Sequence, residues 1–137
     1  MKKIYSIILI CSVLLMLLII GIVLVVEFTE KVPEKPKFHL KDLEKKLKEA
    51  GHKLVVIEFL AIWCGPCRVI NPKFDEMSKK VKNVVFIKVD VDESQDIAEK
   101  FHISAMPEFY FMKNMQNITK MIGSDVERLQ TLIHKYA

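Results

Sequence analysis

The chain has 137 residues, enough for one domain, and 51% of them are apolar. The excess lies in the first 26 residues, of which 21 are apolar; the other 111 have an ordinary globular composition, which excludes a polytopic membrane protein, a disordered chain and a disulfide scaffold. The net charge of +4 comes from interspersed acidic and basic residues without a basic arm, so nucleic-acid binding has no support.

The N-terminal segment is long enough to cross a membrane. Residues 4–26 form a run of 23 residues without a charged side chain, and as a helix this run would extend about 34 Å, against a hydrocarbon core of roughly 30 Å. The alternative is a cleaved signal peptide, but that needs a shorter apolar core and a small-x-small cleavage site. No such site follows the run, so we predict that residues 1–26 are a retained transmembrane anchor.

The lysines around this run point in two directions. Two lysines precede it and four follow it, which by count favours a cytoplasmic C-terminal domain. The short N-terminal tail, with Lys2, Lys3 and the amino group, favours the opposite orientation. A luminal or extracytoplasmic domain therefore stays open as the alternative.

Residues 27–37 are charged and contain Pro33 and Pro36, a composition typical of a solvated tether. After this tether, in residues 38–137, apolar residues alternate between helical and strand-like spacing. The expected elements are a helix over 40–50, a strand over 54–62, a helix over 69–81, a strand over 84–91, a short helix over 94–101, strands over 108–112 and 118–122, and a last helix from 124. This order predicts an α/β domain with a mixed central sheet and helices on both faces.

Several local features refine these elements. The strands over 54–62 and 84–91 are nearly continuous apolar runs, so we expect both to be buried on both faces. Pro72 predicts a kink or break in its helix. Ser94 and Ser124 are expected to cap the helices that follow them.

Two of the three cysteines lie in the pentapeptide Trp63-Cys64-Gly65-Pro66-Cys67, directly after a buried strand and at the start of a helix. At a helix N-terminus, free N–H groups and the helix dipole stabilise a thiolate on Cys64. Gly65 allows the turn, and Pro66 suits the first helical turn. A thiolate beside a second thiol is what dithiol–disulfide exchange requires, so we predict a redox pair.

Two other interpretations of the cysteine pair are weaker. A zinc site would need two further ligands, yet Cys11 lies in the apolar run and the four histidines are scattered without ligand spacing, so we expect no metal. A purely structural disulfide would stabilise little, because closing so short a loop removes little chain entropy.

Residues 38–137 resemble a complete thioredoxin domain of the animal type. The resemblance rests on four groups of residues, namely 54–59, the Trp63–Cys67 pentapeptide, 89–92 with 95–98, and Met106-Pro107. It implies the thioredoxin fold, preceded here by one transmembrane helix that lies outside the match.

The resemblance also implies roles for individual residues. Cys64 would attack a disulfide and Cys67 would resolve the mixed disulfide, while Trp63 would flank the active site. Pro107 matches the family's cis-proline, whose loop packs against the disulfide and pairs with substrate, and Met106 would face that substrate. Pro72 matches the proline that kinks the family's long helix.

Four positions need separate comment. Glu58 stands where the family has a buried aspartate, and a carboxylate there could relay a proton to or from Cys67, unless its longer side chain reaches solvent or pairs with a lysine. Lys88 matches a lysine that lies near that carboxylate in bacterial members. Glu108 replaces a threonine and could place a negative charge beside the substrate groove. The turn over 113–117 lacks the usual glycine, which predicts a less tight hairpin.

We therefore expect a membrane-tethered protein disulfide reductase, held in the membrane by residues 4–26. It would act on disulfide-containing proteins through the Cys64–Cys67 pair without a cofactor, and a partner reductase would supply the electrons. The alternatives are a disulfide oxidase or isomerase of a secretory compartment, and a chaperone-like binding module that uses the cis-proline groove.

Overall fold

The computed structural model describes residues 2–29 and 37–137, and the residues expected to form the tether lie mostly outside this part of the chain. It consists of two compact units, residues 1–36 and residues 37–137. The first unit contains helix α1 (Lys2–Thr29), in which every side chain from Ile4 to Val23 is exposed. By length and composition, Ile4–Val23 could cross a membrane, a property that an N-terminal signal sequence shares.

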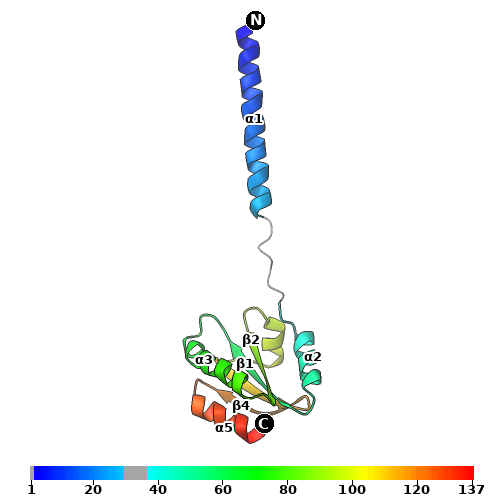
Figure 1. Ribbon diagram of the computed structural model, residues 1–137, viewed down its shortest axis with the longest axis vertical. Helices are drawn as coiled ribbons and strands as arrows, with labels where there is room; N and C mark the ends of the chain where they lie inside the picture. The colour runs from blue at the N-terminus through cyan, green and yellow to red at the C-terminus, as the bar shows by residue number, and fades with distance from the viewer. Residues whose placement is uncertain (1, 30–36) are drawn as a thin grey trace. The chain divides into compact units, whose positions relative to one another are not determined.

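The second unit is built on a four-stranded sheet (Figure 1). Its strands, in the spatial order β2-β1-β3-β4, are β2 (Val84–Asp90), β1 (Leu54–Leu60), β3 (Glu108–Lys113) and β4 (Gln116–Ile122). The pairing of β1 with β2 is parallel, and the other two pairings are antiparallel, so the sheet is mixed as expected. Strand β1 lies in the interior of the sheet, which explains its continuous apolar sequence.

Helices cover both faces of this sheet. They are α2 (Leu40–Ala50), α3 (Gly65–Lys80), α4 (Gln95–Lys100) and α5 (Val126–Tyr136). Because side chains alternate along a strand, neighbouring residues of β1 face opposite sides of the sheet: Ile57 and Phe59 join α2 and α4 on one face, while Val56 joins α3 and α5 on the other. Each such buried side chain stabilises the fold by roughly 1.5–3 kcal/mol.

Strand β2 is less buried than its sequence suggested. Only Val84, Ile87 and Val89 are fully buried, and Lys88 is exposed. The prediction of burial on both faces was wrong because β2 is an edge strand of the sheet, where covering helices reach only part of the side chains.

The β3–β4 hairpin is also tighter than predicted. Asn114 and Met115 are its two turn residues, and both have positive φ, at 51° and 65°. Two consecutive residues with positive φ are characteristic of a type I′ turn, which joins antiparallel strands in the smallest loop. The missing glycine therefore does not loosen the hairpin; non-glycine residues occupy the left-handed conformation instead.

The expected helix ends need three corrections. Helix α3 continues through Pro72 to Lys80, so of the predicted kink or break, the break does not occur. Ser94 stands at the N-cap of α4, but its side chain makes no capping hydrogen bond. Helix α5 is capped by Asp125 rather than Ser124, since the Asp125 carboxylate accepts from the Arg128 backbone N–H at 3.0 Å.

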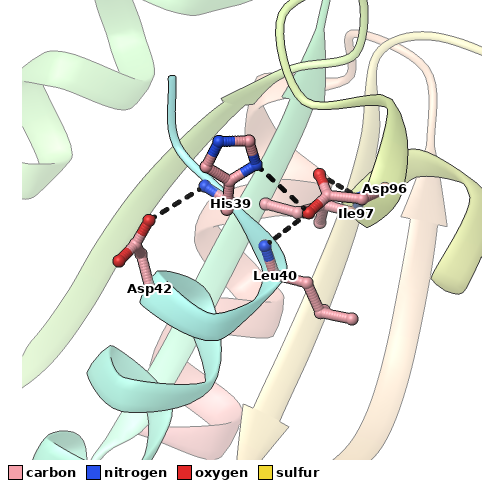
Figure 2. Close-up of polar contacts among 5 residues, drawn as sticks. All are labelled: His39, Leu40, Asp42, Asp96 and Ile97. Atoms are coloured by element: carbon pink, nitrogen blue, oxygen red, sulfur yellow. Dashed lines mark hydrogen bonds and ion pairs between the residues drawn. The ribbon is translucent and has the colours of Figure 1, made fainter. Parts of the chain in front are cut away.

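The start of α2 is fixed by carboxylates on both sides (Figure 2). The His39 N–H donates to Asp42 at 3.1 Å, and the Leu40 N–H donates to Asp96 Oδ2 at 2.8 Å. Asp96 lies at the beginning of α4, so this contact joins two helices that cover the same face of the sheet. The hydrogen bond from the Leu40 N–H lowers the pKa of Asp96. The Ile97 N–H and His39 lower it further, to a smaller extent.

Candidate active site

Cys64 and Cys67 are joined by a disulfide at the N-terminus of α3. Cys64 is the N-cap residue, and its Sγ accepts from the Cys67 N–H at 3.1 Å. Gly65 and Pro66 form the first helical turn between them. Both cysteines are almost completely buried, with Cys64 4% exposed and Cys67 fully covered. The N–H groups at the start of the helix favour negative charge on a sulfur at the N-cap. This position therefore favours a thiolate on Cys64 in the reduced protein.

Exposed apolar side chains border the disulfide. Trp63 is 67% exposed, and its indole Nε1–H donates to Asp92 Oδ2 at 2.9 Å. Ile62 and Val69, on either side of the pair in sequence, are exposed to a similar degree. Apolar residues left in solvent beside a reactive group are typical of a surface that binds another protein.

The loop before β3 contacts the same site. Met106 packs against a small buried cluster formed by Ala61, Cys64 and Cys67. The Met106–Pro107 peptide bond is cis, as the family resemblance implied, and Pro107 is buried. The Pro107 carbonyl accepts from the Gly123 N–H at 2.9 Å, which ties this loop to the end of β4. The structure thus brings Met106 to the cysteine pair across some 40 residues of sequence.

Glu58 is fully buried in β1, so its side chain does not reach solvent. Burial raises its pKa from 4.5 to about 7, with Lys88 opposing the rise and Asp75 adding to it. The Asn71 amide faces the carboxylate, at 2.8 and 2.9 Å from its two oxygens. Cys67 and Asn71 are one turn apart on α3, so Glu58 lies beside the turn that carries Cys67.

Lys88 lies next to Glu58 in the sheet, but its ammonium group binds elsewhere. The two residues are register partners in the parallel pairing of β1 with β2. The Lys88 Nζ is 2.6 Å from Asp75 Oδ1 on α3 and 5.9 Å from the centre of the Phe74 ring. Its influence on Glu58 therefore comes through space rather than through a direct ion pair.

Glu108 does not present its charge to the substrate side of the cis-proline loop. Its side chain is fully buried and pairs with Lys120 of β4 at 2.8 Å. The expectation of a negative charge beside the groove was wrong, because the ion pair turns this carboxylate into the sheet. Tyr110 lies close by, and burial, followed by the Glu108 charge, raises the Tyr110 pKa.

Three residues of this site were not identified from the sequence: Asn71, Asp75 and Asp92. Asn71 and Asp75 follow Cys67 at steps of four along α3. This spacing places Cys67, Asn71 and Asp75 on one helical face and could have drawn attention to the two polar residues. Within residues 2–29 and 37–137, no group of three or more His, Cys, Asp or Glu side chains is arranged to hold a metal ion.

Comparison with known proteins agrees with this geometry. The sequence model of the family described as Thioredoxin matches residues 35–135. Thioredoxin from Ovis aries is 45% identical over 89 residues, which cover 65% of this chain and 85% of the sheep protein. Thioredoxin H-type from Oryza sativa subsp. indica is 50% identical over 91 residues, covering 66% of this chain and 74% of its own.

Solved structures give the same result. Fasciola hepatica thioredoxin superposes with a TM-score of 0.71 at 37% identity, covering 72% of this chain and 95% of its own. Reduced Schistosoma mansoni thioredoxin pre-protein gives a TM-score of 0.69 at 40% identity, with 72% and 93% covered. The family match over residues 35–135 leaves out helix α1.

Proposed function

The chain belongs to the thioredoxin family of protein-disulfide oxidoreductases, and we propose on that premise that it is a membrane-tethered protein disulfide reductase. The observation that carries the proposal is the Cys64–Cys67 disulfide at the start of α3, beside the Met106–Pro107 loop. The Gly-Pro pair between the cysteines resembles that of the reducing members of the family.

The reaction follows from the position of the two cysteines. In the reduced protein, the Cys64 thiolate attacks one sulfur of a substrate disulfide and expels the other as a thiolate, which leaves a mixed disulfide. Cys67 then loses its proton, attacks Cys64 Sγ and expels the second substrate sulfur. Two electrons have passed to the substrate, and the protein is left with the disulfide that the structure contains. A partner reductase restores the dithiol.

Glu58 is the proposed acceptor of the Cys67 proton. Its pKa of about 7 lets it take up and release a proton near neutral pH. Cys67 is fully buried, so its proton cannot pass directly to bulk water. Around the pair, Trp63, Met106 and Pro107 are the proposed substrate-binding residues, because they lie at the disulfide and include its exposed apolar border.

Reduction of insulin by the full chain in detergent tests the proposal, with Cys64→Ser as the decisive variant. We expect no turnover with Cys64→Ser and normal turnover with the control Cys11→Ser, whose cysteine lies in α1. Retained activity in Cys64→Ser would refute the assignment of Cys64 as the nucleophile, whereas no turnover by the unsubstituted chain would favour a binding module. Thioredoxin itself has a reduction potential of about −270 mV, and we expect a similar value here; a potential near −180 mV would instead indicate an oxidase or isomerase.

The membrane tether is proposed from residues 1–26, with residues 27–37 as the link to the domain at 38–137. Its support is the uncharged run and the length of α1. By the lysine count, the proposed single-pass topology places the domain in the cytoplasm. Carbonate extraction of membranes tests the tether: the chain should stay in the pellet at its full mass, whereas a cleaved signal peptide would release a shorter soluble protein.

A further inference from the structure

Helix α3 carries two polar residues toward the strands that flank it. Asn71 follows Cys67 by four residues, and Asp75 follows Asn71 by four, so all three lie along one side of the helix. The buried residues Ile70 and Phe74 lie beside them in the core. Polar side chains next to a core-facing stripe need partners there.

Each of the two residues has a specific partner in the sheet. Asn71 donates to both carboxylate oxygens of Glu58, at 2.8 and 2.9 Å. This is the orientation in which its amide nitrogen meets acceptors and its amide oxygen meets donors. Asp75 Oδ1 accepts from the Lys88 ammonium at 2.6 Å. The neutral amide of Asn71 thus binds Glu58, and the carboxylate of Asp75 binds Lys88.

A simpler arrangement would pair Glu58 with Lys88 directly. The two residues are register partners on neighbouring parallel strands, within reach of a long lysine side chain. Asp75 instead holds the ammonium group at α3, and Lys88 remains partly exposed, with 34% of its side chain accessible. The buried carboxyl group is left with a partner that carries no charge.

We propose that Asn71 and Asp75 are positioning residues for Glu58: Asn71 holds the carboxyl group with a neutral amide, and Asp75 keeps the Lys88 ammonium group away from it. This inference rests on the proposed proton relay through Glu58 and names the residues that make the relay workable. A carboxylate in direct contact with a buried ammonium group stays ionised and cannot exchange a proton near neutral pH.

The charges around Glu58 agree with this division of roles. From β2, Lys88 favours the ionised form; from α3, Asp75 opposes it, and Cys67 is the exchanging thiol. The neighbouring residue on β3, Phe109, is apolar, as are the residues that α5 contributes to this face. With the ammonium group held at a distance, burial has the largest effect and raises the pKa of Glu58 to about 7.

The test is a carboxyl carbon-13 NMR titration of Glu58 in the full-length oxidised chain in detergent micelles. Glu58→Gln assigns the signal. In Asp75→Asn, the released lysine should approach Glu58 and lower its titration midpoint by about one pH unit. In Asn71→Ala, loss of the donated hydrogen bond should raise the midpoint. The matched control is Glu76→Gln, which removes a charge next to Asp75 that pairs with Lys73 and Lys80 instead, and it should leave the midpoint unchanged.

A double variant separates diversion of the lysine from the simple loss of a negative charge. If Asp75 acts by holding Lys88, Asp75→Asn should lower the midpoint far less in a Lys88→Met background than in the wild-type chain. An equal lowering by Asp75→Asn in both backgrounds, or a midpoint that does not move in Asp75→Asn beyond the Glu76→Gln control, overturns the proposal. The same holds if Asn71→Ala folds and leaves the midpoint unchanged.

Activity measured on the same variants distinguishes this inference from the relay on which it rests. If the relay is correct, the pH profile of insulin reduction should move with the Glu58 midpoint in each variant. Midpoints that shift as expected while the activity profiles stay fixed would support the positioning roles and refute the relay. If Asn71→Ala fails to fold, Asp75→Asn and the double variant still decide the role of Asp75, and Asn71→Gln, which keeps the amide, replaces it as the test of Asn71.

Discussion

Lys120 donates a hydrogen bond to the fully buried carboxylate of Glu108 at 2.8 Å, from β4 to the first residue of β3. Glu108 directly follows the cis-proline, so this ion pair holds the strand that leads out of the cis-proline loop. Among the described residues, its second oxygen, Oε2, has no hydrogen-bond partner. Lys120 is half-exposed. Within residues 2–29 and 37–137 it is the only cation bound to the Glu108 carboxylate.

Replacing the lysine should therefore destabilise the domain. In Lys120→Met, Glu108 keeps its buried position but loses the group that compensates its charge, which is a strongly unfavourable state for a carboxylate. We expect a lower urea midpoint, measured by fluorescence of Trp63, the only tryptophan of the chain.

The double variant Glu108→Thr/Lys120→Met is the control for this effect. It removes both charges, so it should recover most of the midpoint that Lys120→Met loses. If the double variant is as unstable as the single one, the loss comes from packing of the lysine stem rather than from an uncompensated charge.

Glu58 should make the stability of the domain depend on pH. Because its pKa is raised from 4.5 to about 7, the folded chain retains a proton that the unfolded chain has released between these values. The associated stability is complete below pH 4.5 and is lost as the pH rises through 7. We expect Glu58→Gln to increase the free energy of unfolding by about 3 kcal/mol at pH 8.5 and to change it little at pH 4.

Urea unfolding at the two pH values measures this difference. Glu44→Gln, an exposed substitution on α2, is the matched control and should show no such pH dependence. An equal effect of Glu58→Gln at both pH values would mean that Glu58 does not titrate in this range in the folded protein.

The hairpin turn offers a stabilising substitution. Met115 has φ of 65° and is 43% exposed, so it occupies a left-handed conformation while its side chain is only partly buried. Met115→Gly should increase the free energy of unfolding by about 1 kcal/mol, since glycine adopts this conformation without steric cost. Gln116→Gly, one residue further and at the first position of β4, should decrease the free energy of unfolding instead.

The proposed topology can be read from a glycosylation sequon. Asn117-Ile118-Thr119 forms one on β4, and Asn117 is exposed. With a cytoplasmic domain, the chain expressed in eukaryotic cells should gain no glycan, and protease added to sealed microsomes should digest the domain. A version with residues 1–26 replaced by a cleaved secretory signal is the control for glycan acceptance. A glycosidase-sensitive mass together with protease protection would locate the domain in the lumen.

The sequence carried most of the fold because local patterns and the tertiary structure agree along the chain. The continuous apolar run of β1 predicted an interior strand, and the cysteine motif was correctly placed at a helix start. The burial of β2 was overestimated, since apolar periodicity does not distinguish an edge strand from a central one. The turn at Asn114 and Met115 was misjudged because non-glycine residues can adopt positive φ when the strands impose it.

The site was predicted in its covalent chemistry but not in its electrostatics. Cys64, Cys67 and Pro107 follow from short motifs whose spacing is local. The partners of Glu58 and Lys88 depend on how a helix packs on two strands, which no spacing in the sequence specifies. The burial of Glu108 likewise depends on a lysine that lies twelve residues away on another strand.

Cys64 caps helix α3, and the helix carries Cys67 and, on its next two turns, the residues that contact Glu58 and Lys88. The Cys-Gly-Pro-Cys motif is therefore only the N-cap and first turn of a sixteen-residue helix. Grafting the motif alone onto a foreign helix would transfer the two thiols without the side chains that contact Glu58 and Lys88. The smallest unit expected to retain the thiols and these contacts keeps the helix through Asp75 together with strands β1 and β2.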